Sequence, residues 1–160
     1  MGLDFTIYWD DINNPIDWND DNFTYDDFKE HELCYGRKSW ELVRALNLPV
    51  DYDGVDPEVK KEDWVNLIKS MLPIASKFES ILKAYQEYLY YDKYEVESIS
   101  EKYRKLMAEY EAWYDKTFDD YPTLGYDFSV VYMQEFYEAN EEVMKCFDDP
   151  SKVVRASISY

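Results

Sequence analysis

Leu-Asp-Phe-Thr-Ile-Tyr, residues 3–8, alternates an apolar side chain with a more polar one along most of its length. A period of two is typical of a half-buried β-strand. Residues 153–160 form a second short segment that is rich in β-branched side chains and contains neither Gly nor Pro. We therefore expect the two ends of the chain to pair in a small antiparallel sheet.

The segment that follows the first strand, about residues 9–32, reads as an acidic excursion rich in turns. Asn-Asn-Pro and Asn-Asp-Asp-Asn clusters interrupt it, and such clusters favour turns over regular structure. A first short helix is expected at about residues 37–47, and Pro49 prevents its continuation.

Asp56-Pro57 supplies an N-cap and a first-turn proline for a second helix, which Pro73 is expected to break or kink. The apolar positions of this helix lie on one face: Trp64, Leu67, Ile68 and Met71.

Three further helices follow by the same periodicity. The first carries an apolar stripe of Ile74, Phe78, Ile81, Leu82, Tyr85 and Leu89. Ser98 or Ser100 caps the next helix, which ends at the loop of residues 120–125, and the last helix spans about residues 129–147. The prediction is one α+β domain over residues 1–160, in which a bundle of about five helices is closed by the terminal strand pair.

Negative charge is the strongest compositional feature. The chain has 35 acidic and 17 basic residues and a net charge of −18, yet 46% of its residues are hydrophobic and 19% aromatic, as a folded domain requires. Residues 1–32 contain ten acids and one base, Lys29. Such a field repels nucleic acid and anionic membranes and attracts basic partners, although acidity alone also confers solubility.

Familiar catalytic and metal motifs are missing from the sequence. His31 is the one histidine, and with Cys34 it gives too few ligands for zinc. Residues 35–39, Tyr-Gly-Arg-Lys-Ser, lack the Gly and Lys spacing of a phosphate loop, and the aspartate-rich turns do not fit a calcium loop. We predict no enzymatic activity, no cofactor and no metal site, with Cys34 and Cys146 as buried, reduced thiols.

The location of the protein can also be predicted. No run approaches the roughly 20 apolar residues that span a bilayer, and the first residues lack the basic and apolar regions of a signal peptide. A cytosolic protein is expected.

Two stretches carry a resemblance: the opening Met1-Gly2-Leu3-Asp4, and Glu32-x-x-Tyr35-x-Arg37-Lys38. They resemble small bacteriophage proteins that begin Met-Gly-Leu-Asp, contain a Glu-x-x-Tyr-Trp-Arg-Lys segment and finish in an aromatic-rich strand. The likeness covers the two ends of the chain and the segment near residue 35. It implies a phage or prophage origin and supplies no activity.

The leading functional hypothesis is an acidic phage inhibitor in the host cytoplasm. It would imitate DNA and so occupy the basic, nucleic-acid-binding surface of a host defence protein, such as a CRISPR effector or a restriction enzyme. The candidate contacts are Asp10, Asp11, Asp17, Asp20, Asp21, Asp26, Asp27, Asp115, Asp119, Asp120, Glu135, Glu138 and Glu142. Trp9, Trp18, Phe23 and Tyr25 either anchor this interface or fold back onto the domain.

Two other classes stay open. One is a small enzyme or ligand-binding protein with a pocket lined by tyrosines and carboxylates, for which 17 Tyr provide material. The other is a phage assembly factor. Converging carboxylates and a metal in a deep pocket would favour the first, whereas a convex acidic surface would favour the inhibitor.

Overall fold

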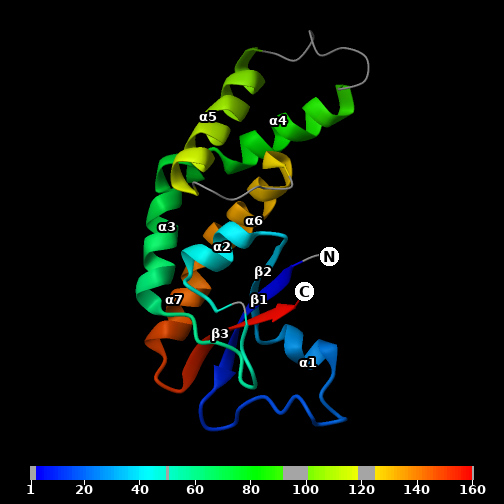
Figure 1. Ribbon diagram of the computed structural model, residues 1–160, viewed down its shortest axis with the longest axis vertical. Coiled ribbons are helices and arrows are strands. Elements are labelled where there is room, and N and C mark those ends of the chain that lie inside the picture. Colours follow the sequence, from blue (N-terminus) through cyan, green and yellow to red (C-terminus); the bar gives the residue numbers. More distant parts are fainter. Residues whose placement is uncertain (1–2, 50, 92–100, 119–124, 160) are drawn as a thin grey trace.

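The computed structural model of the protein describes residues 3–49, 51–91, 101–118 and 125–159. A three-stranded sheet lies at one end of the molecule and helices extend from it to the other end (Figure 1). The elements are β1 (Asp4–Asp11), α1 (Tyr25–Lys29), β2 (Glu32–Arg37), α2 (Trp40–Ala45), α3 (Lys61–Ala75), α4 (Phe78–Tyr91), α5 (Glu101–Thr117), α6 (Tyr126–Glu138), α7 (Asn140–Asp148) and β3 (Lys152–Ser159). The predicted α+β class is confirmed.

The two ends of the chain pair as expected. β1 is the central strand of the order β2-β1-β3, and both of its neighbours are antiparallel to it. Asp4 stands opposite Ser159 and Phe5 opposite Ile158, and the pairing continues along the whole of β1. The chain therefore closes on itself through the terminal strands.

β2 was not predicted; it lies between the turn-rich excursion expected at about residues 9–32 and the helix expected from about residue 37. Its inward positions are Cys34 and Gly36, which are too small to produce a clear apolar alternation. Gly36 faces the Phe5 ring, and a methyl group on Gly36 would overlap that ring. Phe5 thus requires a glycine on the neighbouring strand.

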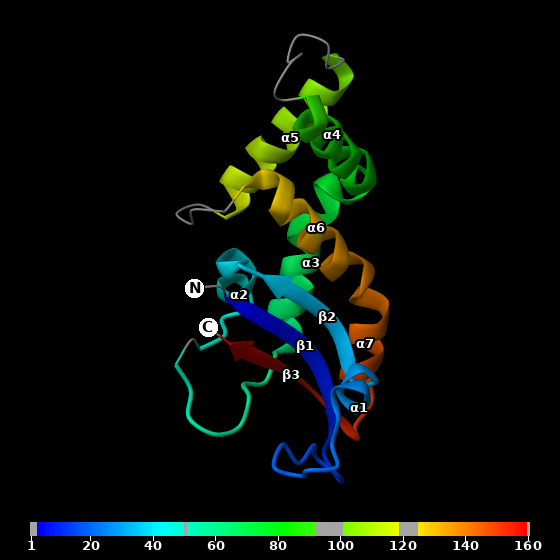
Figure 2. The same ribbon diagram turned by 90° about the vertical axis from the view of Figure 1, so that its right-hand side faces the viewer.

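The apolar face of the sheet packs against α6 and α7, with α3 behind them (Figure 2). Phe136 of α6 is fully buried; its ring centroid is 5.5 Å from that of Phe5 and 5.8 Å from that of Trp64 on α3. Trp64 also donates a hydrogen bond from Nε1 to Oδ1 of Asn140, at 2.9 Å. Three aromatic rings therefore connect the sheet to two helices.

The second predicted helix begins later than expected. It starts at Lys61 because residues 57–59 run along the edge of β3, where the Val59 amide donates to the Val154 carbonyl at 2.8 Å. Asp56 does not cap a helix and instead accepts hydrogen bonds from the hydroxyls of Tyr8 and Tyr52, each at 2.8 Å. The first predicted helix is also shorter and forms α2.

Pro73 does not break α3, which continues to Ala75. Pro73 has no N–H to donate within the helix, and the helix continues for only two residues beyond it. The helix predicted at 129–147 is in fact two helices, α6 and α7, which meet at Ala139. The described ranges thus contain seven helices rather than about five, while Ser98 and Ser100 lie outside them.

We expect Phe136→Ala to lower the free energy of unfolding by about 3–5 kcal/mol, because it leaves a cavity between Phe5 and Trp64. Phe128→Ala is the matched control, since Phe128 lies on the same helix and is 53% exposed. That change should cost no more than about 0.5 kcal/mol. Urea unfolding followed by circular dichroism measures both, and equal costs would contradict the packing described.

Candidate functional site

The segment between β1 and β2, residues 12–31, contains five of the thirteen predicted contacts, and we call it the acidic segment. Its aspartates form local turns: Asp17 Oδ1 accepts from the Asn19 amide at 3.0 Å, and Asp20 Oδ1 accepts from the Asn22 amide at 2.9 Å. Such bonds between an aspartate and the backbone two residues later fix the path of a turn. The acidic segment therefore has a defined conformation.

A capping box fixes the start of α1. The Thr24 amide donates to Oδ2 of Asp27 at 2.7 Å, and the Asp27 amide donates to Oγ1 of Thr24 at 3.3 Å. The hydrogen bonds from the Thr24 backbone and side chain hold the pKa of Asp27 below its ordinary value. A carboxylate thus remains charged where α1 begins.

An aromatic cluster fastens the acidic segment to the sheet. Trp18 lies with its ring centroid 5.9 Å from Tyr8 of β1, 5.7 Å from Phe23 and 5.2 Å from Phe28. Trp18 is nevertheless 52% exposed. Trp18 and Phe23 therefore fold back onto the domain, but one ring still faces solvent.

Trp9 and Tyr25 behave differently from each other. Trp9 packs against the His31 ring, with centroids 4.1 Å apart, and beneath the Lys152 ammonium group. Tyr25 is 66% exposed on α1 and contacts the Lys29 ammonium group. Of these two, Tyr25 is the residue that a partner can reach.

The predicted acids differ in accessibility. Asp10 is 6% exposed; it accepts from the Ile16 amide and lies 3.6 Å from Nε of Arg155, so it stabilises the fold. Asp11 accepts from the amides of Asn13 and Asn14. Within residues 12–31, all of which the structure describes, the exposed carboxylates that make no hydrogen bond or ion pair are Asp21, Asp26 and Glu30.

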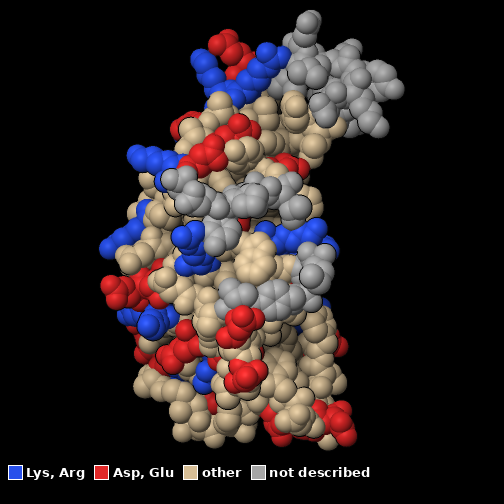
Figure 3. All heavy atoms as spheres, viewed as in Figure 1, with Lys and Arg blue, Asp and Glu red and all other residues tan. Residues whose placement is uncertain are grey.

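Acidic side chains are spread over the visible face, with one group at the lower right, where α1 and the preceding turns lie, while Lys and Arg side chains project mainly at the left and the top (Figure 3). The six acids of the acidic segment are Asp17, Asp20, Asp21, Asp26, Asp27 and Glu30. Each of them is exposed, and Lys29 is the one base among them.

The remaining candidates are more scattered. Asp115 on α5 accepts from the Tyr126 hydroxyl at 2.9 Å, whereas Asp119 and Asp120 lie outside the described residues. Glu138 ends α6, and Glu142 belongs to α7, where it pairs with Lys145 at 3.0 Å. The break at Ala139 therefore separates glutamates that were expected on one helix.

Glu135 lies at the outer edge of β2, where its Oε1 accepts from the Tyr35 amide at 3.1 Å. Burial raises the pKa of Glu135, and the nearby carboxylates of Glu32 and Glu138 raise it further, against the effect of the Tyr35 amide. The carboxylates of Glu32, Glu135 and Glu138 therefore lie close together. Glu32 was not among the predicted contacts.

A concavity of about 440 Å³ lies on the polar face of the sheet beside α1, and we call it the sheet-face pocket. Its carboxylates are Asp4, Glu32 and Glu135, its rings are Tyr25, Phe28 and Tyr35, and its hydroxyls come from Thr6, Ser157 and Ser159. In the described residues no group of three His, Cys, Asp or Glu side chains is arranged to hold a metal ion.

A second pocket, of about 470 Å³, lies between α2, α3 and the end of α5. Glu41, at 3% exposure, lines it, and burial raises the pKa of this carboxyl group. Burial and the nearby Glu41 carboxylate raise the pKa of the Tyr114 phenol. Its hydroxyl is buried and makes no hydrogen bond of ordinary geometry in the described structure. One carboxyl group lines this pocket, so a pair of acids for general acid and base catalysis is lacking among its described residues.

Sequence reasoning missed Asp4, Glu32, Tyr35 and Glu41. For Asp4 and Tyr35, the signal was the alternation of β1. The polar residues of β1 share one face of the sheet with the residues that pair with them on β2. The burial of Glu41 depends on tertiary packing and leaves no local signal. Cys34 and Cys146 are buried and unbonded, as expected.

Thr24→Val tests whether the capping box fixes the acidic segment. Loss of the hydroxyl should raise the pKa of Asp27, and Thr24→Ser should preserve it, as read by carbon NMR titration of the carboxyl groups. Because the folded-state pKa is lowered, this contribution to stability is present above the unfolded-state pKa and is lost as pH falls through the folded-state value. An unchanged Asp27 titration in the valine variant would refute the capping box.

Comparison with known proteins adds no relative. The chain matches no protein-family model, no curated protein and no solved structure. Among the described residues, no helix is both long and apolar enough to cross a membrane.

Proposed function

We propose that this protein is an acidic inhibitor that occupies the basic, nucleic-acid-binding surface of another protein by imitating DNA. One observation supports this most strongly: the acidic segment has a fixed conformation and exposes six carboxylates beside a single base. A disordered acidic tail would lose conformational entropy on binding, whereas this segment is already ordered.

Electrostatics explains why such a segment can compete with DNA. Duplex DNA carries about one negative charge per 1.7 Å of its axis, and its partners meet that charge with Lys and Arg side chains. A fixed group of carboxylates addresses the same side chains. Association should then be fast at low salt and weaken as ionic strength rises.

The resemblance to small phage proteins suggests the kind of partner. We propose a host defence protein that binds nucleic acid, such as a CRISPR effector or a restriction enzyme, in the host cytoplasm, and no enzymatic activity of this chain. The contact surface centres on the acidic segment. Asp10 does not belong to it because it is buried, and Asp115, Glu138 and Glu142 lie outside it, on α5, α6 and α7.

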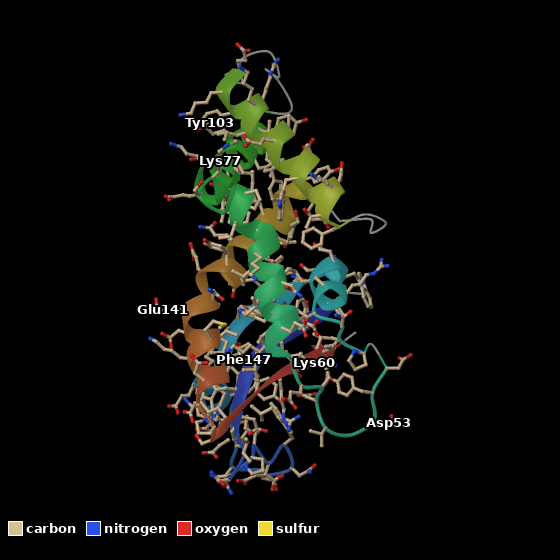
Figure 4. The ribbon with its side chains drawn as sticks, turned by 90° about the vertical axis from the view of Figure 1, so that its left-hand side faces the viewer. Asp53, Lys60, Lys77, Tyr103, Glu141 and Phe147 are labelled. Atoms are coloured by element: carbon tan, nitrogen blue, oxygen red, sulfur yellow. The ribbon has the colours of Figure 1, made fainter. Side chains whose placement is uncertain are left out.

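The test neutralises Asp21, Asp26 and Glu30 together, as Asn, Asn and Gln. The matched control makes the same changes at Asp51, Asp53 and Glu58, which are exposed on the loop beside β3 (Figure 4). The protein is used to capture partners from host lysate, and duplex DNA or salt is used to release them. We expect a DNA-binding protein that duplex DNA displaces, with capture at least about ten-fold weaker for the first triple variant.

Capture that resists both duplex DNA and high salt would contradict mimicry. Equal losses for the two triple variants would mean that net charge alone governs binding, and the acidic segment would then have no special part in it.

A further inference from the structure

The sheet-face pocket lies directly against the acidic segment, because Tyr25 and Phe28 of α1 form one of its walls. Thr6 of β1 forms its floor, with Tyr35 of β2 on one side and Ser157 of β3 on the other. Their side chains share the polar face of the sheet, since directly paired residues point the same way. The floor is thus made of hydroxyl groups on three adjacent strands.

Of the three carboxylates in this pocket, Asp4 alone has a cationic partner among the described residues. Asp4 lies 3.5 Å from Nε of Arg37, and its buried Oδ1 accepts no hydrogen bond within the described structure. Burial and the Asp4 carboxylate together raise the pKa of the Tyr35 phenol to about 12. Glu32 and Glu135 add two further carboxylates, and the described residues provide no cation that pairs with either of them.

We propose that the sheet-face pocket binds the guanidinium group of an arginine side chain. The inference rests on the proposed function, because the arginine belongs to the basic partner that the acidic segment attracts. The pocket offers carboxylate and hydroxyl acceptors around a cation, and aromatic rings at its wall. An anionic ligand would meet three carboxylates in the same space.

Arginine fits these features better than lysine does. A guanidinium group is planar and has five N–H donors, so it can bind several acceptors and stack on an aromatic ring at once. The ammonium group of lysine is a more strongly hydrated point charge with three donors. Arginine beside aromatic side chains in a partly closed pocket is also a common source of binding energy at protein interfaces.

The location gives the pocket a distinct part in recognition. Exposed carboxylates of the acidic segment act over about one Debye length, roughly 8–10 Å, and so attract a basic surface in any orientation. A pocket requires contact and a particular side chain. The pocket would therefore select one arginine after the acidic segment has brought the partner close.

The test is an NMR titration of the full chain with the peptide acetyl-Gly-Arg-Gly-amide, alongside peptides with lysine or citrulline in place of arginine. Citrulline has nearly the same shape as arginine but no charge. We expect the arginine peptide to shift the backbone amide signals of Thr6 and Ser157, the lysine peptide to bind more weakly, and the citrulline peptide to cause no shift.

Two variants and one control assign the site. Glu32→Gln and Glu135→Gln should each weaken arginine binding about five-fold through loss of a charge-assisted hydrogen bond. In the second variant the amide oxygen can still accept from the Tyr35 amide, so the fold is preserved. Glu142→Gln removes the same charge on α7 and should leave the affinity unchanged.

Equal binding of citrulline and arginine, shifts confined to the acidic segment, or an equal effect of Glu142→Gln would overturn the inference. A wrong proposed function gives a different result: partner capture would be insensitive to salt and to duplex DNA. That result does not depend on whether the arginine peptide binds the pocket. If capture needs Asp21, Asp26 and Glu30 but the peptide does not bind the pocket, the inhibitor proposal survives and the arginine pocket does not.

Discussion

β1 is hydrogen-bonded on both of its edges, and this arrangement determines much of the molecule. Each side chain of β1 must face either the helical layer or the opposite face of the sheet, because successive residues alternate between the two. Phe5 and Ile7 face the helices and are fully buried there. The opposite face therefore receives Asp4, Thr6, Tyr8 and Asp10, two of which are carboxylates.

The polar face divides into two parts with different roles. At one end Tyr8 donates to Asp56, while Arg155 contacts Asp10 and donates to the Asp56 carbonyl at 2.9 Å. Burial and the adjacent Asp56 carboxylate raise the pKa of Tyr8, so the phenol stays a hydrogen-bond donor. At the other end Asp4 pairs with Arg37, while Glu32 and Glu135 have no cationic partner among the described residues, and all three carboxylates line the sheet-face pocket.

Prediction from sequence succeeded where a local pattern identifies an element. The alternation in residues 3–8 and the β-branched end of the chain were enough to predict the terminal strand pair. Sequence-based prediction failed where a distant segment determines the position of an element. β2 needs Gly36 because of Phe5, and α3 starts late because residues 57–59 pair with β3. Acidity predicted a candidate surface, but only packing shows that Asp10 is buried and that Glu135 lies beside Glu32.

An acidic surface alone gives little selectivity, because any basic protein is attracted to it and salt weakens all such contacts together. Selectivity requires a feature that only some partners satisfy at short range. In this fold the α1 helix belongs both to the acidic segment and to the wall of the sheet-face pocket. On the proposals made above, one helix would then serve both attraction and selection. A partner that presents an arginine at the right distance from its basic surface would gain both interactions, and other basic proteins would gain only the first.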